Sequence, residues 1–572
     1  MPVRPPFNSR PLLAGLAATV LVALAACSAA KPEAPAADNA APTLSDQTAE
    51  RAQLHEHLAA APPAKRAALG RVASPHSAYA LMPMPADAWP PSYRDANREQ
   101  YQKLADNPVH AVAETPVSTF SIDVDTGSYA NVRRLLNGGQ LPPPGAVRLE
   151  ELVNYFPYAY PLPKGDVPFG VHTELAVTPW NTHSRLLRIA IKASDLRVEA
   201  LPAANLVFLV DISGSMDRRE GLPMVQSTLK LLVEQLRAQD SVSLVVYAGS
   251  SRVVLQPTSG SEKAKIRAAI DQLTAGGSTA GESGIQLAYQ QAQQGFIEGG
   301  INRILLATDG DFNVGISDFD SLKQLAADKR KTGISLTTLG FGTDNYNEQL
   351  MEQLADAGDG NYAYIDTLRE ARKVLVDQLS STLATVASDV KIQVEFNPAQ
   401  VSEYRLLGYE NRALKREDFS NDKVDAGEIG AGHTVTALYE VAPVGGKGWL
   451  EPLRYQPAVK GAKKHGELAW LRIRYKTPGQ GVSQLLEQPI QAGDVPAIDH
   501  ASEDLRFAAA VAAFAQQLTG ATYTGRFSLA DSADLARTAK GEDRFGLRSE
   551  FVQLVELAQS LHTSADRERR AD

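Results

Sequence analysis

The sequence predicts an α/β protein built on a doubly wound, mostly parallel sheet, flanked by an N-terminal mixed region and a C-terminal β-sandwich-like and helical region. Two patterns carry this prediction. In residues 201–390, short continuous apolar runs alternate with amphipathic helices, as parallel strands covered on both faces require. From about residue 391, strand-like runs follow one another without intervening helices, which favours a β-sandwich-like unit.

The central region, residues 201–390, contains alternating strand-like and helical stretches. The apolar runs are residues 206–210, 242–247, 304–307, 334–339 and 362–365. The helical stretches are residues 224–236, 266–273, 285–292, 322–329 and 350–355. The first helical stretch follows Pro223, a residue suited to a first helical turn, and carries apolar side chains at helical spacing. Residues 252–255 follow a strand after a short turn, so we expect an antiparallel edge strand there.

The two flanking regions are residues 105–200 and 391–572. In the first, strand-like runs at 118–124 and 185–191 enclose a helical stretch at 129–136. In the second, four strand-like runs precede two helical stretches. The strand-like runs are residues 390–396, 404–409, 434–441 and 468–475, and the helical stretches are residues 503–518 and 548–561.

The N-terminus is predicted to be a bacterial lipoprotein signal peptide, residues 1–27. Arg4 and Arg10 supply a positive start, and an apolar stretch ends in Leu24-Ala25-Ala26-Cys27. This ending resembles a lipobox, in which the cysteine is acylated and becomes the mature N-terminus. The residue after Cys27 is Ser28. By resemblance to Gram-negative lipoproteins, the lack of Asp at this position favours the outer over the inner membrane, with the protein facing the periplasm. Residues 28–104 are rich in Ala and Pro and are expected to form a tether.

The charge of the chain excludes one class of partner. The formal net charge is −9, and loss of residues 1–26 removes two Arg and no acid, which makes the mature chain near −11. The sequence has no dense basic stripe, so nucleic acid is not an expected partner. No later stretch is long and apolar enough to span a bilayer, so the predicted membrane contact is the N-terminal lipid alone.

Oxygen-bearing side chains gather at the carboxyl ends of the predicted central strands. Asp211, Ser213 and Ser215 follow the first strand, Asp309 follows the run at 304–307, and Thr279 lies in a Gly-rich loop between them. Ligands bind at this edge of an open doubly wound sheet. Hydroxyl and carboxylate oxygens without His or Cys suit a small hard cation, so we expect Mg²⁺, with Mn²⁺ or Ca²⁺ as alternatives.

These five residues resemble the metal-ion-dependent adhesion site of von Willebrand factor type A domains. The resemblance implies that Ser213 and Ser215 bind the metal directly and that Thr279 binds directly or through water. It also implies that Asp211 and Asp309 act mostly through water or behind the direct ligands. One coordination position would stay open for a Glu or Asp of a partner protein in the cell envelope.

The regions outside the central part resemble a bacterial family of von Willebrand factor A lipoproteins. The resemblance rests on residues 118–126, residues 308–315 and the strand-rich tail, and it covers nearly everything after residue 105. It implies an architecture more than a function.

Two alternatives to metal-dependent protein binding remain open. The chain could be a structural envelope protein in which the metal only stabilises loops. More remotely, Asp125-Thr126-Gly127-Ser128 matches the active-site sequence of aspartic proteases, but that chemistry needs two carboxylates sharing a proton, and the chain has no second copy of the sequence. We find no phosphate-binding loop and no Gly-x-Ser-x-Gly elbow, so we do not expect an enzyme.

Overall fold

The computed structural model describes residues 99, 101, 105–165, 167–196, 200–278, 281–310, 319–343, 346–424, 426–451, 453, 466–478, 481–520 and 522–571. The predicted signal peptide with Cys27, almost all of the predicted tether and Thr279 lie outside these residues. Within the described part of the chain, no helix combines the length and apolarity that a membrane crossing needs.

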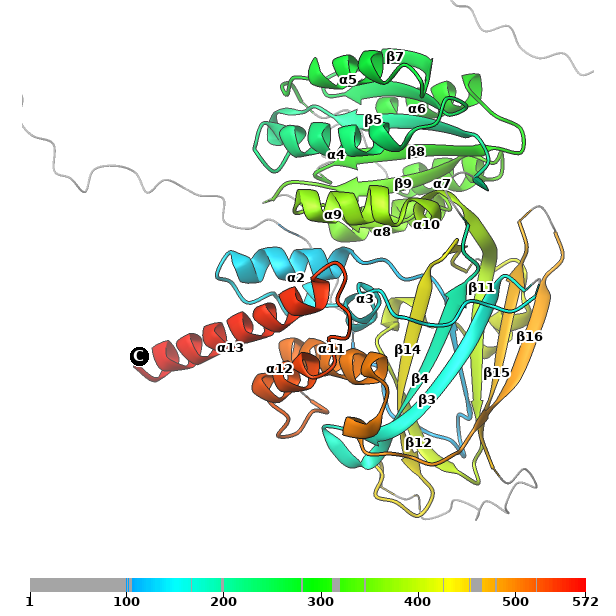
Figure 1. The fold of residues 1–572 in the computed structure, drawn as a ribbon, viewed down its shortest axis with the longest axis vertical. Helices are drawn as coiled ribbons and strands as arrows, with labels where there is room; N and C mark the ends of the chain where they lie inside the picture. The colour runs from blue at the N-terminus through cyan, green and yellow to red at the C-terminus, as the bar shows by residue number, and fades with distance from the viewer. Residues whose placement is uncertain are drawn as a thin grey trace, which may run out of the picture. The chain divides into compact units, whose positions relative to one another are not determined.

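A six-stranded sheet forms the centre of the α/β part, in the order β10-β9-β8-β5-β6-β7 (Figure 1). The strands are β5 (Ala204–Asp211), β6 (Ser241–Tyr247), β7 (Ser251–Ser259), β8 (Ile301–Thr308), β9 (Ser335–Gly340) and β10 (Tyr362–Tyr364). All neighbouring pairs are parallel except β6 and β7, which are antiparallel. The predicted doubly wound sheet and its antiparallel edge strand are therefore confirmed.

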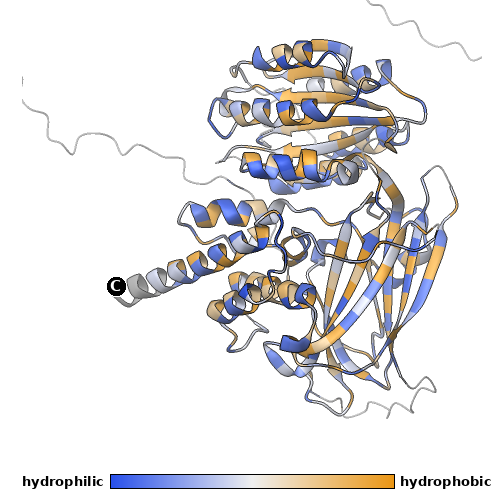
Figure 2. Ribbon diagram, in the orientation of Figure 1, coloured by the Kyte–Doolittle hydropathy of each residue, from blue (hydrophilic) through white to orange (hydrophobic). Residues whose placement is uncertain are grey.

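Helices cover both faces of this sheet because both faces are apolar. Successive side chains of a strand point to opposite faces, and β5 is buried along its whole length. Leu206, Phe208 and Val210 pack on one side with α4 (Leu222–Gln235) and α5 (Lys263–Asp271). Val207 and Leu209 pack on the other side with helices α6 (Gly281–Gln294), α7 (Phe319–Arg330) and α8 (Glu348–Ala357). Figure 2 shows the apolar strands between helices that carry polar residues outward.

Two antiparallel sheets form the second part of the fold. The first has the order β1-β12-β14-β4-β3, and the second has the order β13-β11-β15-β16. Strand β2 pairs with β11 on the side opposite β15. The first sheet comprises β1 (His110–Ala111), β3 (Phe169–Thr178), β4 (Asn181–Ala193), β12 (Val401–Leu407) and β14 (Thr434–Pro443). The second comprises β2 (Val117–Ser121), β11 (Thr385–Phe396), β13 (Ile429–Gly430), β15 (Glu467–Lys476) and β16 (Gln484–Gln491). Strands that precede and follow the α/β part thus share both sheets.

The alternation along β4 assigns its two faces to two cores. Leu187, Ile189 and Ile191 pack between the sheets. Leu186 and Ala190 face a helical layer on the other side. That layer consists of α2 (Gly127–Asn137), α3 (Leu149–Asn154), α11 (Glu503–Thr519), α12 (Leu529–Arg537) and α13 (Leu547–Ala571). The predicted helices near 129–136, 503–518 and 548–561 correspond to α2, α11 and α13.

Candidate functional site

The candidate site lies where two parallel neighbours of the central sheet end. Asp211 is the last residue of β5, and Thr308 is the last residue of β8. Because β5 and β8 pair in parallel register, the residues that follow them lie at one edge of the sheet. Asp211 and Asp309 are both buried there, with exposed fractions of 0% and 2%.

The chain itself holds the Asp211 carboxylate on both oxygens. The backbone N–H of Ser213 donates to Oδ1 at 2.8 Å, and the Thr308 hydroxyl donates to Oδ2 at 2.8 Å. Thr308 is fixed in turn, because its Oγ1 accepts from the backbone N–H of Gly310 at 3.1 Å. Burial raises the pKa of Asp211 to about 6 and the charge of Asp309 adds to this, while the hydrogen bonds from Ser213 and Thr308 oppose it. Asp211 is therefore a positioned carboxylate that connects the ends of β5 and β8.

Two serine hydroxyls lie beside this carboxylate. The Oγ atoms of Ser213 and Ser215 are 3.0 Å apart, across the short 3₁₀ turn Gly214–Met216. Two backbone hydrogen bonds join this turn to the next loop, from Gly214 to the Gly277 carbonyl at 3.0 Å and from Gly276 to the Ile212 carbonyl at 2.8 Å.

The loop that carries Thr279 needs glycine to make this approach. Gly276 and Gly277 have φ values of +155° and +99°, a region that L side chains rarely adopt. The loop therefore bonds to the Asp-x-Ser-x-Ser turn just ahead of Thr279. The structure brings together Asp211, Ser213, Ser215 and Asp309, and Thr279 itself lies outside the described residues.

The donor set fits a hard cation. Its groups are hydroxyl and carboxylate oxygens, which suit Mg²⁺, and two hydroxyls within 3.0 Å can face one ion. Gly214, Asp217 and Ser278 beside them are exposed, so solvent or a ligand reaches this edge of the sheet. Ser213 and Ser215 would hold the ion directly, while Asp211, with both oxygens already bonded, would act from behind them.

Sequence reasoning did not identify the roles of Thr308 and Tyr247. Thr308 donates to Asp211, and its position directly before Asp309 was the available signal. The carbonyl of Tyr247, at the end of β6, accepts from Ile212 at 3.0 Å and so holds the turn that carries the serines. Gly284 of α6 packs on the Tyr247 ring, where a Cβ atom would lie 2.8 Å from the Tyr247 Cβ.

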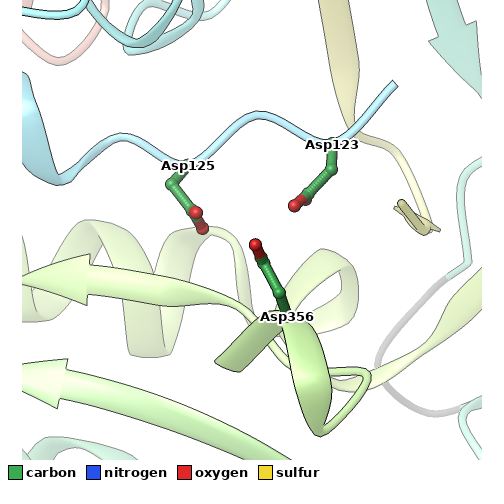
Figure 3. A group of neighbouring side chains, drawn as sticks. All are labelled: Asp123, Asp125 and Asp356. Carbon is green, nitrogen blue, oxygen red and sulfur yellow. The ribbon is translucent and has the colours of Figure 1, made fainter. Parts of the chain in front are cut away.

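A second acidic group lies away from these residues, between the two parts of the fold (Figure 3). Carboxylate oxygens of Asp123, Asp125 and Asp356 lie within 4.8 Å of one another. The Arg412 guanidinium contacts all three, at 3.1 Å, 3.1 Å and 2.6 Å, and also Glu352 at 2.9 Å. Arg412 thus supplies the cation of this cluster, which joins the segment after β2, helix α8 and the segment after β12.

Asp125, the residue of the protease alternative, is committed to this packing. It is 5% exposed, and its Oδ1 accepts the backbone N–H of Tyr362 at 2.8 Å while Oδ2 accepts from Arg412. Gly127 begins α2 against the Tyr362 ring, where a Cβ atom would lie only 2.3 Å from a ring carbon. The Asp-Thr-Gly sequence is therefore accounted for by a helix start packed on β10.

Sequence comparison identifies the family. Residues 205–378 match the von Willebrand factor type A domain, residues 95–188 match a von Willebrand factor family, and residues 381–561 match the C-terminal region of uncharacterized protein YfbK. Uncharacterized protein YfbK of Escherichia coli strain K12 is 54% identical over 468 residues, which cover 80% of this chain and 81% of that protein. The chain belongs to the YfbK family. The type A domain indicates a role in protein–protein interaction or adhesion.

Other relatives match with lower identity. Uncharacterized protein sll0103 of Synechocystis is 34% identical over 191 residues, covering 33% of this chain and 44% of that protein. Human inter-alpha-trypsin inhibitor heavy chain H4 is 30% identical over 159 residues, covering 26% of this chain and 17% of that protein. Among solved structures, a von Willebrand factor type A protein from Catenulispora acidiphila matches with a TM-score of 0.39 and 17% identity, covering 67% of this chain and 89% of that chain.

Proposed function

We propose that this chain is a lipid-anchored envelope protein that captures a partner protein through a divalent cation, Mg²⁺ in the first instance. The observation that carries the proposal is the pair of hydroxyls of Ser213 and Ser215, 3.0 Å apart beside a carboxylate that the chain holds on both oxygens. Thr279 and Asp309 would complete the metal shell. The predicted anchor is Cys27, and the predicted location is the outer membrane, facing the periplasm.

The partner would supply the last ligand. Mg²⁺ requires nearly octahedral coordination and retains waters that an incoming carboxylate can replace. A Glu or Asp on an envelope protein fits that position, and the exposed residues around Ser215 leave room for it. The role proposed is binding, not catalysis, because the buried carboxylates of Asp125, after β2, and Asp211, at the end of β5, are already bonded within the chain.

Metal-dependent capture is the direct test of this function. Envelope proteins would be cross-linked to the full-length chain in cells, with and without a chelator, and identified by mass spectrometry. We expect one specific partner to be captured. Its capture should be lost when the chelator is present and in the Ser213→Ala/Ser215→Ala variant. Replacing the Glu or Asp of that partner that coordinates the metal by Gln or Asn should also abolish capture.

A matched control is available at the end of β7. Ser259 and Ser261 have the same spacing, and their Oγ atoms lie 2.9 Å apart on an exposed surface away from Asp211. The Ser259→Ala/Ser261→Ala variant should capture the partner normally. If capture survives chelation in the unmodified chain while only the melting temperature falls, the metal is stabilising and the structural alternative is correct.

A further inference from the structure

A cavity of about 600 Å³ lies outside the candidate metal site. Its lining comes from α9 (Leu368–Arg372) and α10 (Leu379–Leu383), the end of β4, the start of β14, the segment after α3 and the loop before α13. Its volume is within the range of pockets that hold small molecules, roughly 300–1,000 Å³. None of its lining residues belongs to the set Asp211, Ser213, Ser215 and Asp309.

The lining is cationic, although the whole chain has a net charge of −9. Five basic side chains line the cavity: Lys192, Arg369, Arg372, Lys373 and Arg544. Two carboxylates, Asp195 and Asp377, line it as well. The wall therefore has more basic than acidic side chains, and a cleft with an excess of one charge raises the local concentration of ions of opposite charge.

Some of these cations have partners within the chain. Lys373 lies 3.3 Å from Glu370 and also 3.3 Å from the centre of the Tyr155 ring. Lys192 donates to the Gly432 carbonyl at 2.5 Å. Arg369 reaches Glu550 at 3.3 Å. Contacts within the chain therefore hold these three side chains in place at the cavity wall.

The other two arginines are different. Among the described residues, no carboxylate lies within ion-pair distance of Arg372 or Arg544, and both side chains are exposed. The Arg544 guanidinium lies 5.3 Å from the ring centre of Phe545, which is itself 41% exposed. Two free guanidinium groups at a cavity that already contains three further cations can receive an anion without breaking an existing ion pair.

The chemistry of the wall selects the class of ligand. Guanidinium groups bind phosphate and carboxylate oxygens in bidentate fashion. Ser380 and Thr434 add hydroxyl groups to the wall, and Phe156 and Phe545 add aromatic surface. We propose that this cavity binds a small organic molecule that carries at least two negative charges, as phosphate or carboxylate groups.

Calorimetric titration of the full-length chain in detergent tests this site. The probes are pyrophosphate and citrate, at physiological ionic strength and with a chelator present so that the metal site makes no contribution. We expect saturable one-to-one binding of at least one probe. In Arg372→Gln/Arg544→Gln the dissociation constant should rise at least roughly tenfold, since a hydrogen bond between charged groups contributes about that factor.

The control variant removes the same charge elsewhere. Lys265→Gln/Lys331→Gln replaces two exposed lysines on α5 and after α7, and it should bind the probe like the unmodified chain. Preference for pyrophosphate would identify a phosphate-bearing ligand, and preference for citrate a polycarboxylate. Binding of neither probe would overturn the proposal, as would equal weakening in both double variants or no weakening in Arg372→Gln/Arg544→Gln.

Discussion

Thr308→Val removes one hydroxyl from the candidate metal site and leaves the shape of the side chain almost unchanged. That hydroxyl donates to Asp211 Oδ2 at 2.8 Å and accepts from the Gly310 N–H at 3.1 Å. Asp211 is 0% exposed, so water cannot replace the lost donor without rearrangement. Loss of a hydrogen bond to a charged group costs about 1.5–3 kcal/mol, and we expect a decrease of that size in the free energy of unfolding.

The larger consequence concerns the metal. Partners that orient metal ligands typically change metal affinity by roughly 10–100-fold when they are mutated. We therefore expect Thr308→Val to raise the dissociation constant for Mg²⁺ by about that factor, or about 1.4–2.7 kcal/mol. Calorimetric titration measures this constant, and urea unfolding measures stability in the same preparation.

A second buried threonine provides the control. Thr258 on β7 is 3% exposed, and its hydroxyl donates to the Gln256 carbonyl at 2.7 Å. Thr258→Val should lower stability by about 1 kcal/mol and leave Mg²⁺ affinity unchanged. A folded Thr308→Val variant that binds Mg²⁺ as tightly as the unmodified chain would refute the positioning role of Thr308.

Three further variants test buried charges and close packing outside the candidate metal site. Burial raises the pKa of Asp123 to about 8, although the charge of Arg412 opposes the rise, so the folded chain retains a proton that the unfolded chain loses near pH 4. Stability should then fall as pH rises from about 4 to about 8, and Asp123→Asn should reduce this dependence in urea unfolding. Glu440→Gln should cost about 3–5 kcal/mol in urea unfolding, because it leaves buried Arg405, now 2.7 Å from Glu440, without its counter-charge. Gly127→Ala should lower stability by about 1–3 kcal/mol in thermal unfolding, because its Cβ would overlap the Tyr362 ring.

Each of these variants has a matched control on the surface. Asp271→Asn on α5 should leave the pH slope as it is, and equal slopes for Asp123→Asn and the unmodified chain would contradict the assignment. Glu487→Gln breaks an exposed pair with Arg472 at 3.0 Å and should cost less than about 1 kcal/mol. Gly481→Ala has no atom within 4 Å of the added Cβ, and a loss equal to that of Gly127→Ala would show that packing is not the cause.

Local periodicity predicted the α/β part because local patterns determine it. The run at 206–210 corresponds to β5, and the stretch at 224–236 corresponds to α4, within a residue or two. Parallel strands are buried on both faces and so read as continuous apolar runs, which are easily distinguished from amphipathic helices. The candidate metal site was predicted by the same reasoning, since strand ends in a parallel sheet meet at one edge.

The flanking regions were less predictable because their pairing is long-range. Strand β2 pairs with β11, for example Ile392 with Phe120, across more than half of the described chain. The apolar run at 118–124 was predicted as one strand, but the strand ends at Ser121 because Asp123 and Asp125 turn toward Arg412. Strands β3 and β16 were not predicted, because half-exposed edge strands such as β16 carry few apolar residues.

The ion-pair clusters were also beyond sequence reasoning. Arg412 gave no local signal, and its carboxylate partners come from two other segments of the chain. Only the fold brings them together, since each residue alone reads as an ordinary surface charge. The same holds for the cationic cavity, whose arginines at 372 and 544 are far apart in the sequence.

The measurement that tests metal binding most directly is calorimetric titration of Mg²⁺ into the full-length chain, the Ser213→Ala/Ser215→Ala variant and the Ser259→Ala/Ser261→Ala variant. The proposed site predicts one-to-one binding to the unmodified chain and to the Ser259/Ser261 variant, and none to the Ser213/Ser215 variant. Equal binding by all three proteins, or no binding by the unmodified chain, would contradict it.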